Sequence, residues 1–99
     1  MKKIVLVLLM VILANLVIAT VQNSSWDGSV YQVKMYLKDN LKDPKSVEYI
    51  EWSDVIKEGK YYMVRCKYRA RNSFGGYTIE NKLFYIDAYT EEVVYYVDY

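Results

Sequence analysis

Residues 61–87, YYMVRCKYRARNSFGGYTIENKLFYID, decide the fold of this chain. Apolar and basic side chains alternate along Tyr61–Asn72, which predicts a strand with one buried face and one solvated face. The buried face would carry Tyr62, Val64, Cys66, Tyr68 and Ala70. The other face would carry Arg65, Lys67, Arg69 and Arg71. Ser73–Tyr77 contains two glycines and predicts a turn, so that Thr78–Tyr89 returns as the second strand of a hairpin.

The length of the hairpin loop determines which residues face each other. With a three-residue loop at 74–76, Ser73 faces Tyr77 and Cys66 faces Phe84. Both strands then place their apolar side chains on one face, a sorting that a slip by one residue would destroy. We therefore expect Cys66 to be buried and slow to react with thiol reagents.

The segments around the hairpin complete the predicted fold. Apolar residues at helical spacing predict an amphipathic helix, and they are Trp26, Val30, Val33, Leu37 and Leu41. Ser24, Ser25 or Asp27 is expected to cap its start, and Asp43–Pro44 to end it. A first strand is expected at 47–56 and a last strand at 93–98. The predicted fold class is α+β, with one N-terminal amphipathic helix packed on a four-stranded antiparallel meander sheet in two layers.

The first 21 residues have the pattern of an export signal. Lys2 and Lys3 precede an apolar run, and Ala19 before Thr20 fits a cleavage site. Removal of a signal peptide is one interpretation. The other is an uncleaved signal anchor, because the run is about as long as the shortest membrane-spanning helices.

The predicted organisation follows from this leader. Its parts are a signal peptide over 1–19 or a signal anchor over 4–21, a polar linker over 20–25, and a single α+β domain over 26–99. The lysines before the run place the domain on the far side of the membrane in either case. We expect an exported, extracytoplasmic protein that is secreted or tethered to the cytoplasmic membrane.

Composition excludes several functions. Without Lys2 and Lys3 the chain has 11 basic and 12 acidic residues, a net charge of −1, which gives no electrostatic basis for nucleic acid binding. There is no histidine, so the chain lacks an imidazole base and the usual zinc ligands. Cys66 is the single cysteine, so no internal disulfide can form. We expect no enzyme activity, no metal and no cofactor.

The outer face of the sheet is the candidate site. Its predicted partner-binding residues are Arg65, Lys67, Arg69, Arg71, Phe74, Tyr77 and Tyr85. Tyrosine and arginine dominate the hot spots of protein interfaces. A solvated sheet face also needs long basic side chains for solubility, so both interpretations remain open. Phe74 at the loop tip is either an anchor for a partner or a side chain folded back over the sheet edge.

Two functions from different classes are compatible with this face. The first is an exported binding module without catalytic activity that contacts an envelope or extracellular protein through the outer sheet face and the 73–77 hairpin. The alternative is a membrane-anchored structural or accessory domain that faces anionic lipid. The last strand can lie at an exposed edge, which leaves pairing between copies open.

Three motifs resemble those of known families. LKDNLKDPKSV at 37–47 and RARNSFGGY at 69–77 resemble the "LKDP-x-S" and "A-K-N-S-F-G-G-Y" motifs of small exported or lipoprotein-like domains of bacteria and phages. The resemblance spans about residues 30–88 and implies export and the α+β fold, without an activity. This chain lacks the lipid-attachment cysteine of many such domains. IDAYTEEV at 86–93 is similar, more loosely, to a turn of PepSY-type domains.

Overall fold

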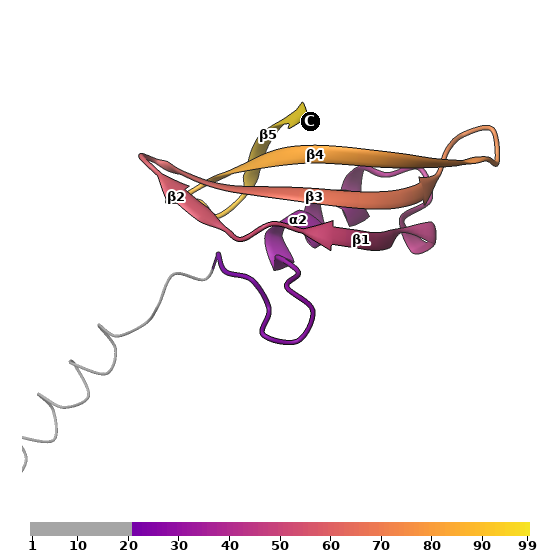
Figure 1. Cartoon of the computed structure of the whole chain (residues 1–99). Coiled ribbons are helices and arrows are strands. Elements are labelled where there is room, and N and C mark those ends of the chain that lie inside the picture. Colours follow the sequence, from indigo (N-terminus) through magenta and orange to yellow (C-terminus); the bar gives the residue numbers. More distant parts are fainter. Residues whose placement is uncertain (1–20) are drawn as a thin grey trace, which may run out of the picture.

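The computed structural model describes residues 21–99 and confirms the α+β fold class (Figure 1). Its elements are α2 (Tyr31–Asn40), the 3-10 helix η1 (Pro44–Ser46), β1 (Glu48–Trp52), β2 (Ile56–Glu58), β3 (Tyr61–Arg71), β4 (Tyr77–Asp87) and β5 (Val93–Asp98). The strands form one antiparallel sheet in the order β1-β3-β4-β5, and β2 also pairs with β3. The described part of the chain therefore has five strands, not the four that we expected.

The additional strand arises because the segment predicted at 47–56 is interrupted. Ser53 leaves the regular ladder, and its hydroxyl accepts a hydrogen bond of 2.7 Å from the backbone N–H of Arg65. The Asn23 side chain donates to Ser53 O at 2.9 Å and accepts from Val55 N at 2.8 Å. Asn23 thus satisfies backbone groups where the pairing breaks, and β1 and β2 lie one after the other along β3.

The β3–β4 hairpin has a longer loop than predicted, and its register differs by two residues. Arg71 pairs with Tyr77, and Cys66 pairs with Lys82 in place of the expected Phe84. The loop is 72–76, closed by a hydrogen bond of 2.7 Å from Asn72 N to Gly76 O. A shift by two residues leaves every side chain on its predicted face, because the strand repeat is two residues.

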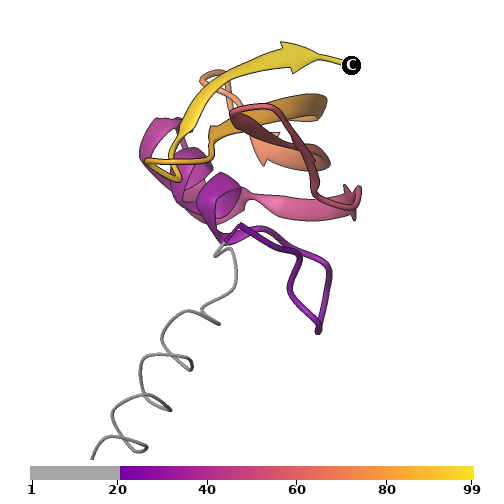
Figure 2. The same cartoon turned by 90° about the vertical axis from the view of Figure 1, so that its left-hand side faces the viewer.

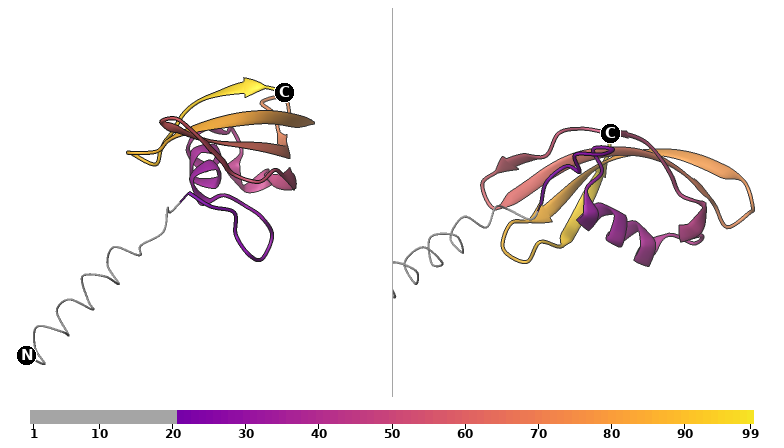
Figure 3. Two further views of the ribbon diagram at one scale, coloured as in Figure 1. Left: turned by 60° about the vertical axis from the view of Figure 1, so that its left-hand side comes forward. Right: turned by 90° about the horizontal axis from the view of Figure 1, so that it is seen from below.

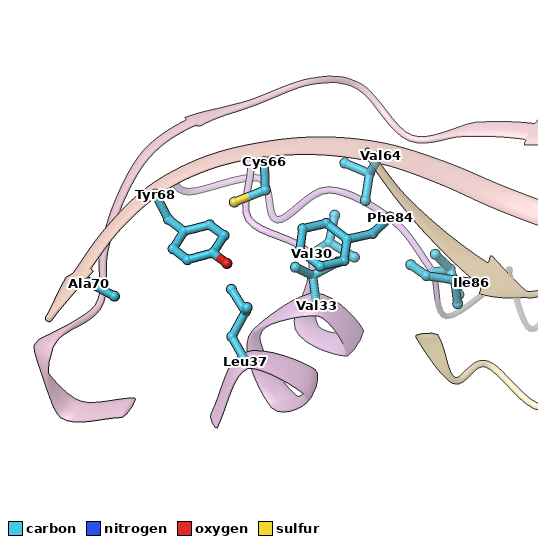
Figure 4. Close-up of a cluster of buried hydrophobic side chains, with 10 residues drawn as sticks. Val30, Val33, Leu37, Val64, Cys66, Tyr68, Ala70, Phe84 and Ile86 are labelled. Atoms are coloured by element: carbon cyan, nitrogen blue, oxygen red, sulfur yellow. The ribbon is translucent and has the colours of Figure 1, made fainter. Parts of the chain in front are cut away.

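The core lies between α2 and the sheet (Figure 4). Val33 and Leu37 of the helix and Val30 before it pack beneath the sheet. The fully buried side chains of β3 and β4 are Val64, Cys66, Phe84 and Ile86. The predicted burial of Cys66 is confirmed, and this burial raises the pKa of its thiol to about 12.

The helix is shorter than predicted at both ends. Trp26 was expected on its buried stripe, but this side chain is 95% exposed in a turn before the helix. Two of the predicted capping residues serve that turn, because Trp26 N donates to Ser24 Oγ at 3.2 Å and Ser29 N donates to Asp27 Oδ1 at 2.9 Å. The helix begins at Tyr31 and ends at Asn40, before Pro44, because Leu41 has an extended ψ of 150°.

The chain before the helix belongs to the folded domain from residue 21 onward. Val21 is buried in the core, although we expected residues 20–25 to form a linker. Asn23 also donates to Gly28 O at 2.8 Å. The predicted signal peptide at 1–19 and most of the alternative anchor at 4–21 lie outside the described residues. Among residues 21–99, no helix combines the length and apolar character needed to cross a membrane.

The sheet bends around the helix, so its two faces differ in shape. Figure 2 and the right-hand view of Figure 3 show α2 on the concave side, with the strands arched over it. The other face is convex and is not covered by any element of residues 21–99 (Figure 3). This convex face is the outer face predicted from the alternation of β3.

Candidate functional site

The convex face brings together most of the predicted site residues. They are Arg65, Lys67, Arg69 and Arg71 of β3, with Tyr77 and Tyr85 of β4. In the observed register Arg69 pairs with Ile79, and Tyr85 pairs with Met63. Phe74 stands apart in the loop that joins the two strands, at the far end of the hairpin (Figure 1).

The basic side chains of β3 form a row, Arg65, Lys67, Arg69 and Arg71, and part of this basic row is paired with carboxylates of β1. Arg65 Nη2 lies 2.6 Å from Glu51 Oε1, and Arg69 Nη1 lies 3.4 Å from Glu48 Oε2. Arg65 also donates to Asn81 Oδ1 at 3.0 Å. The Arg65 guanidinium lowers the pKa of the Glu51 carboxyl through its hydrogen bond to Glu51 and through its charge. Two of the four basic groups are therefore held in ion pairs.

Tyr77 gathers the two arginines nearest the loop. The Arg69 guanidinium carbon lies 4.0 Å from the centroid of the Tyr77 ring, and that of Arg71 lies 5.3 Å away. Arg71 Nη2 also donates to the Tyr77 hydroxyl at 3.3 Å. Cation–π contacts of this kind hold guanidinium groups in place while leaving donors free for a ligand.

The loop presents Phe74 to solvent. This side chain is 97% exposed, so the alternative in which it folds back over the sheet edge is wrong. Asn72 Oδ1 accepts hydrogen bonds from Phe74 N at 2.9 Å and from Gly76 N at 3.1 Å. Gly75 has φ 83°, a left-handed conformation that suits glycine. The backbone that carries Phe74 is thus fixed by local hydrogen bonds.

A tyrosine cluster occupies the opposite end of the convex face. It consists of Tyr61, Tyr85 and Tyr95, from β3, β4 and β5. The Tyr85 and Tyr95 rings stack at 4.3 Å between centroids, and Tyr61 meets both edge-on at 5.9 Å. The sequence analysis named Tyr85 as a site residue but missed Tyr95. Alternation within 93–98 was the signal for it, because Tyr95 falls on the same face as Val97.

The described residues offer no obvious means of holding a metal. Between residues 21 and 99, no group of three or more cysteine, aspartate or glutamate side chains is placed to bind an ion. The one thiol, that of Cys66, is buried on the concave side. The convex face presents aromatic surface, guanidinium donors and carboxylates, which suit non-covalent recognition.

Comparison with protein-family models, with curated proteins and with solved structures returns no match for this chain. The resemblance to small exported domains of bacteria and phages therefore stays a prediction.

Proposed function

We propose that this chain is an exported binding module without catalytic activity, and that it contacts an envelope or extracellular protein. The contact surface is the hairpin end of the convex face, formed by Arg69, Arg71, Phe74 and Tyr77. The observation that carries the proposal is the nearly complete exposure of Phe74 on a loop fixed by Asn72.

An exposed phenylalanine on a fixed loop suits an anchor. Its ring gains no burial within residues 21–99, so its apolar surface becomes useful only when a partner covers it. The loop hydrogen bonds restrict the backbone before binding, which lowers the entropy lost when a complex forms. Aromatic anchors flanked by arginine are typical of residues that dominate binding energy.

The charge arrangement favours a protein partner over an anionic membrane. Glu48 and Glu51 lie beside the basic row and neutralise part of its field. A lipid-facing surface would gain from unpaired lysine and arginine, each worth about 1 kcal/mol near an anionic bilayer. A protein partner instead benefits from mixed charges, because they set orientation and specificity.

Photo-crosslinking of the full-length chain tests the proposal. A photoreactive phenylalanine analogue replaces Phe74 in cells of the source organism. The matched control carries it at Trp26, which is similarly exposed in a turn outside the convex face. We expect an adduct with an envelope or extracellular protein from position 74 and none from position 26. No protein adduct from position 74, or the same adducts from both positions, would overturn the proposal.

The membrane-facing alternative makes a different prediction in the same cells. Adducts from position 74 would then contain lipid and no protein. Vesicles of phosphatidylglycerol would also retain the chain at low salt and release it at high salt. We expect instead that the protein adduct at position 74 still forms when the sample is irradiated at high salt, because a packed aromatic contact depends little on ionic strength.

A further inference from the structure

We propose that β5 pairs with β5 of a second copy of this chain, antiparallel, with Val97 facing Val97 across a two-fold axis. The two sheets would then join into one continuous sheet. This pairing is independent of the proposed partner contact at Phe74, which lies at the other end of the hairpin (Figure 1).

The two edges of the sheet differ in how they resist such pairing. The edge formed by β1 and β2 is broken at Ser53 and shifts register between Tyr49 and Glu51. Interruptions, bulges and charges of this kind protect an edge strand from pairing with another chain. β5 pairs with β4 alone among the described strands, and over 95–98 its pairing is regular. Asp98 is its one charged residue.

The backbone groups that β5 turns outward follow from its pairing with β4. Tyr99 N donates to Asn81 O at 2.8 Å, so Tyr99 faces β4. Hydrogen-bonding direction alternates along an antiparallel strand. The backbone N–H and C=O groups of Val97 and Tyr95 therefore also point towards β4, whereas those of Tyr96 and Asp98 point to the free side. A second strand can pair with these outward groups.

A two-fold axis at Val97 satisfies those groups reciprocally. Tyr96 of one copy pairs with Asp98 of the other, and each N–H meets a C=O. The axis uses the regular segment from residue 95 onward and avoids the irregularity opposite Ile86. The Asp98 carboxylates do not face each other, so the register opposes no like charges.

The side chains of the convex face fit the same register. Val97 meets Val97, and Tyr95 of one copy meets Tyr99 of the other. Tyr95 already stacks on Tyr85, so the tyrosine cluster of each copy would continue into the second. Aromatic and β-branched cross-strand pairs stabilise a sheet relative to alanine pairs. The face is therefore self-complementary at this edge.

Disulfide crosslinking of the full-length chain tests the pairing and its register. Facing residues at a non-hydrogen-bonded position have Cα atoms about 4.5 Å apart, within the range that a disulfide spans, about 4.4–6.8 Å. The test variant is Val97→Cys. The matched control is Val94→Cys, because Val94 and Val97 lie on the same strand and are 49% and 47% exposed. In this register the two copies of residue 94 are offset by about 20 Å.

Each variant is expressed with its own leader and oxidised in the cells, and non-reducing electrophoresis gives the crosslinked fraction. We expect a disulfide dimer for Val97→Cys, at least fivefold more abundant than for Val94→Cys. The native chain, with its single buried Cys66, gives the baseline. Equal crosslinking of the two variants, or none for Val97→Cys, would overturn the proposal. Crosslinking of Val97→Cys would also be absent if another protein covered this edge, and that result would equally overturn the proposal.

A second variant keeps the test valid if Val97→Cys disturbs the fold. Tyr95→Cys with Tyr99→Cys places two further facing pairs across the same axis, and it leaves Val97 intact. We expect this double variant to form the dimer and each single variant to form much less. Protection of Cys66 from thiol reagents reports that each variant is folded. A folded double variant without dimer would overturn the register.

Discussion

Cys66 illustrates how one residue reports on the whole core. Its side chain is fully buried in the core between β3 and α2 (Figure 4). We expect its reaction with Ellman's reagent to be slow in the native protein and fast after denaturation. The measurement is the labelling rate with and without denaturant at neutral pH. Rapid labelling of the native protein would contradict the observed position of β3.

The buried thiol also makes stability depend on alkaline pH. Burial raises its pKa from an ordinary 9.0 to about 12, so the folded state holds its proton more tightly than the unfolded state. Its contribution to stability is complete below pH 9 and is lost as the pH rises towards 12. Cys66→Ala should therefore lose less stability than the native chain over this interval. Urea unfolding at pH 8 and pH 11 measures the difference, and equal losses would contradict it.

Phe74 and Phe84 are the two phenylalanines of the chain, and their roles are opposite. Phe84 is fully buried, whereas Phe74 is almost fully exposed. We expect Phe74→Ser to change the free energy of unfolding by less than about 1 kcal/mol, and Phe84→Ala to cost about 3–5 kcal/mol. Chemical denaturation of both variants provides the comparison. A loss above about 2 kcal/mol for Phe74→Ser would assign its ring to the core.

At the scale of elements, Asp87 closes the turn between β4 and β5. Its Oδ1 accepts hydrogen bonds of 2.8 Å from the backbone N–H groups of Tyr89 and Thr90, and these lower the pKa of the carboxyl below 3.8. The charged form is thus favoured in the folded state. This stabilisation is complete above pH 3.8 and disappears as the pH falls through the lowered pKa.

The corresponding variant is Asp87→Ala, with Asp39→Ala as the control on the exposed side of α2. We expect Asp87→Ala to lower the melting temperature at pH 6, and the difference from the native chain to shrink at pH values below 3.8. Asp39→Ala, which leaves the turn intact, should change the melting temperature little at either pH. A constant difference for Asp87→Ala across the acid range would show that the carboxylate charge has no role there.

The elements also show which local features the sequence alone could predict. Alternation placed every side chain of β3 on the correct face, because successive side chains of a strand point to opposite faces of the sheet. The hairpin register was wrong, since the loop length depends on Asn72 bonding to two backbone N–H groups. The split between β1 and β2 depends on Asn23, which is 30 residues away from Ser53 in the chain. Such long-range polar contacts have no local pattern.

At the scale of the molecule, the sequence predicted the two layers and the basic row of the outer sheet face, but not the electrostatic balance of that row. The predicted strand at 47–56 was correctly placed next to the hairpin, yet the facing of Glu48 and Glu51 towards arginines required the observed pairing of β1 with β3. Tyr77, likewise, was a site residue in the sequence interpretation, but its contact with two guanidinium groups depends on the actual register.

The balance of charge on the convex face leads to a further prediction. Glu48→Gln with Glu51→Gln removes two carboxylates from the basic row and should create a surface that binds anionic vesicles. Asp39→Asn with Glu92→Gln changes the net charge equally, away from the row, and should bind much less. Flotation with phosphatidylglycerol vesicles at low and high salt measures retention. Equal retention of the two variants would mean that net charge, and not the row, governs binding.

The burial of Val21 has a consequence for the first of the two interpretations of the leader, removal of a signal peptide. If a peptidase cuts after Ala19, the bond lies two residues before a side chain packed in the core. Proteases act on exposed, flexible segments, and the hydrogen bonds of Asn23 hold the chain just beyond this point. Cleavage and folding would then compete. A domain that folds first would keep its leader, so one gene product could supply both a released and a tethered form, in a ratio set by two rates.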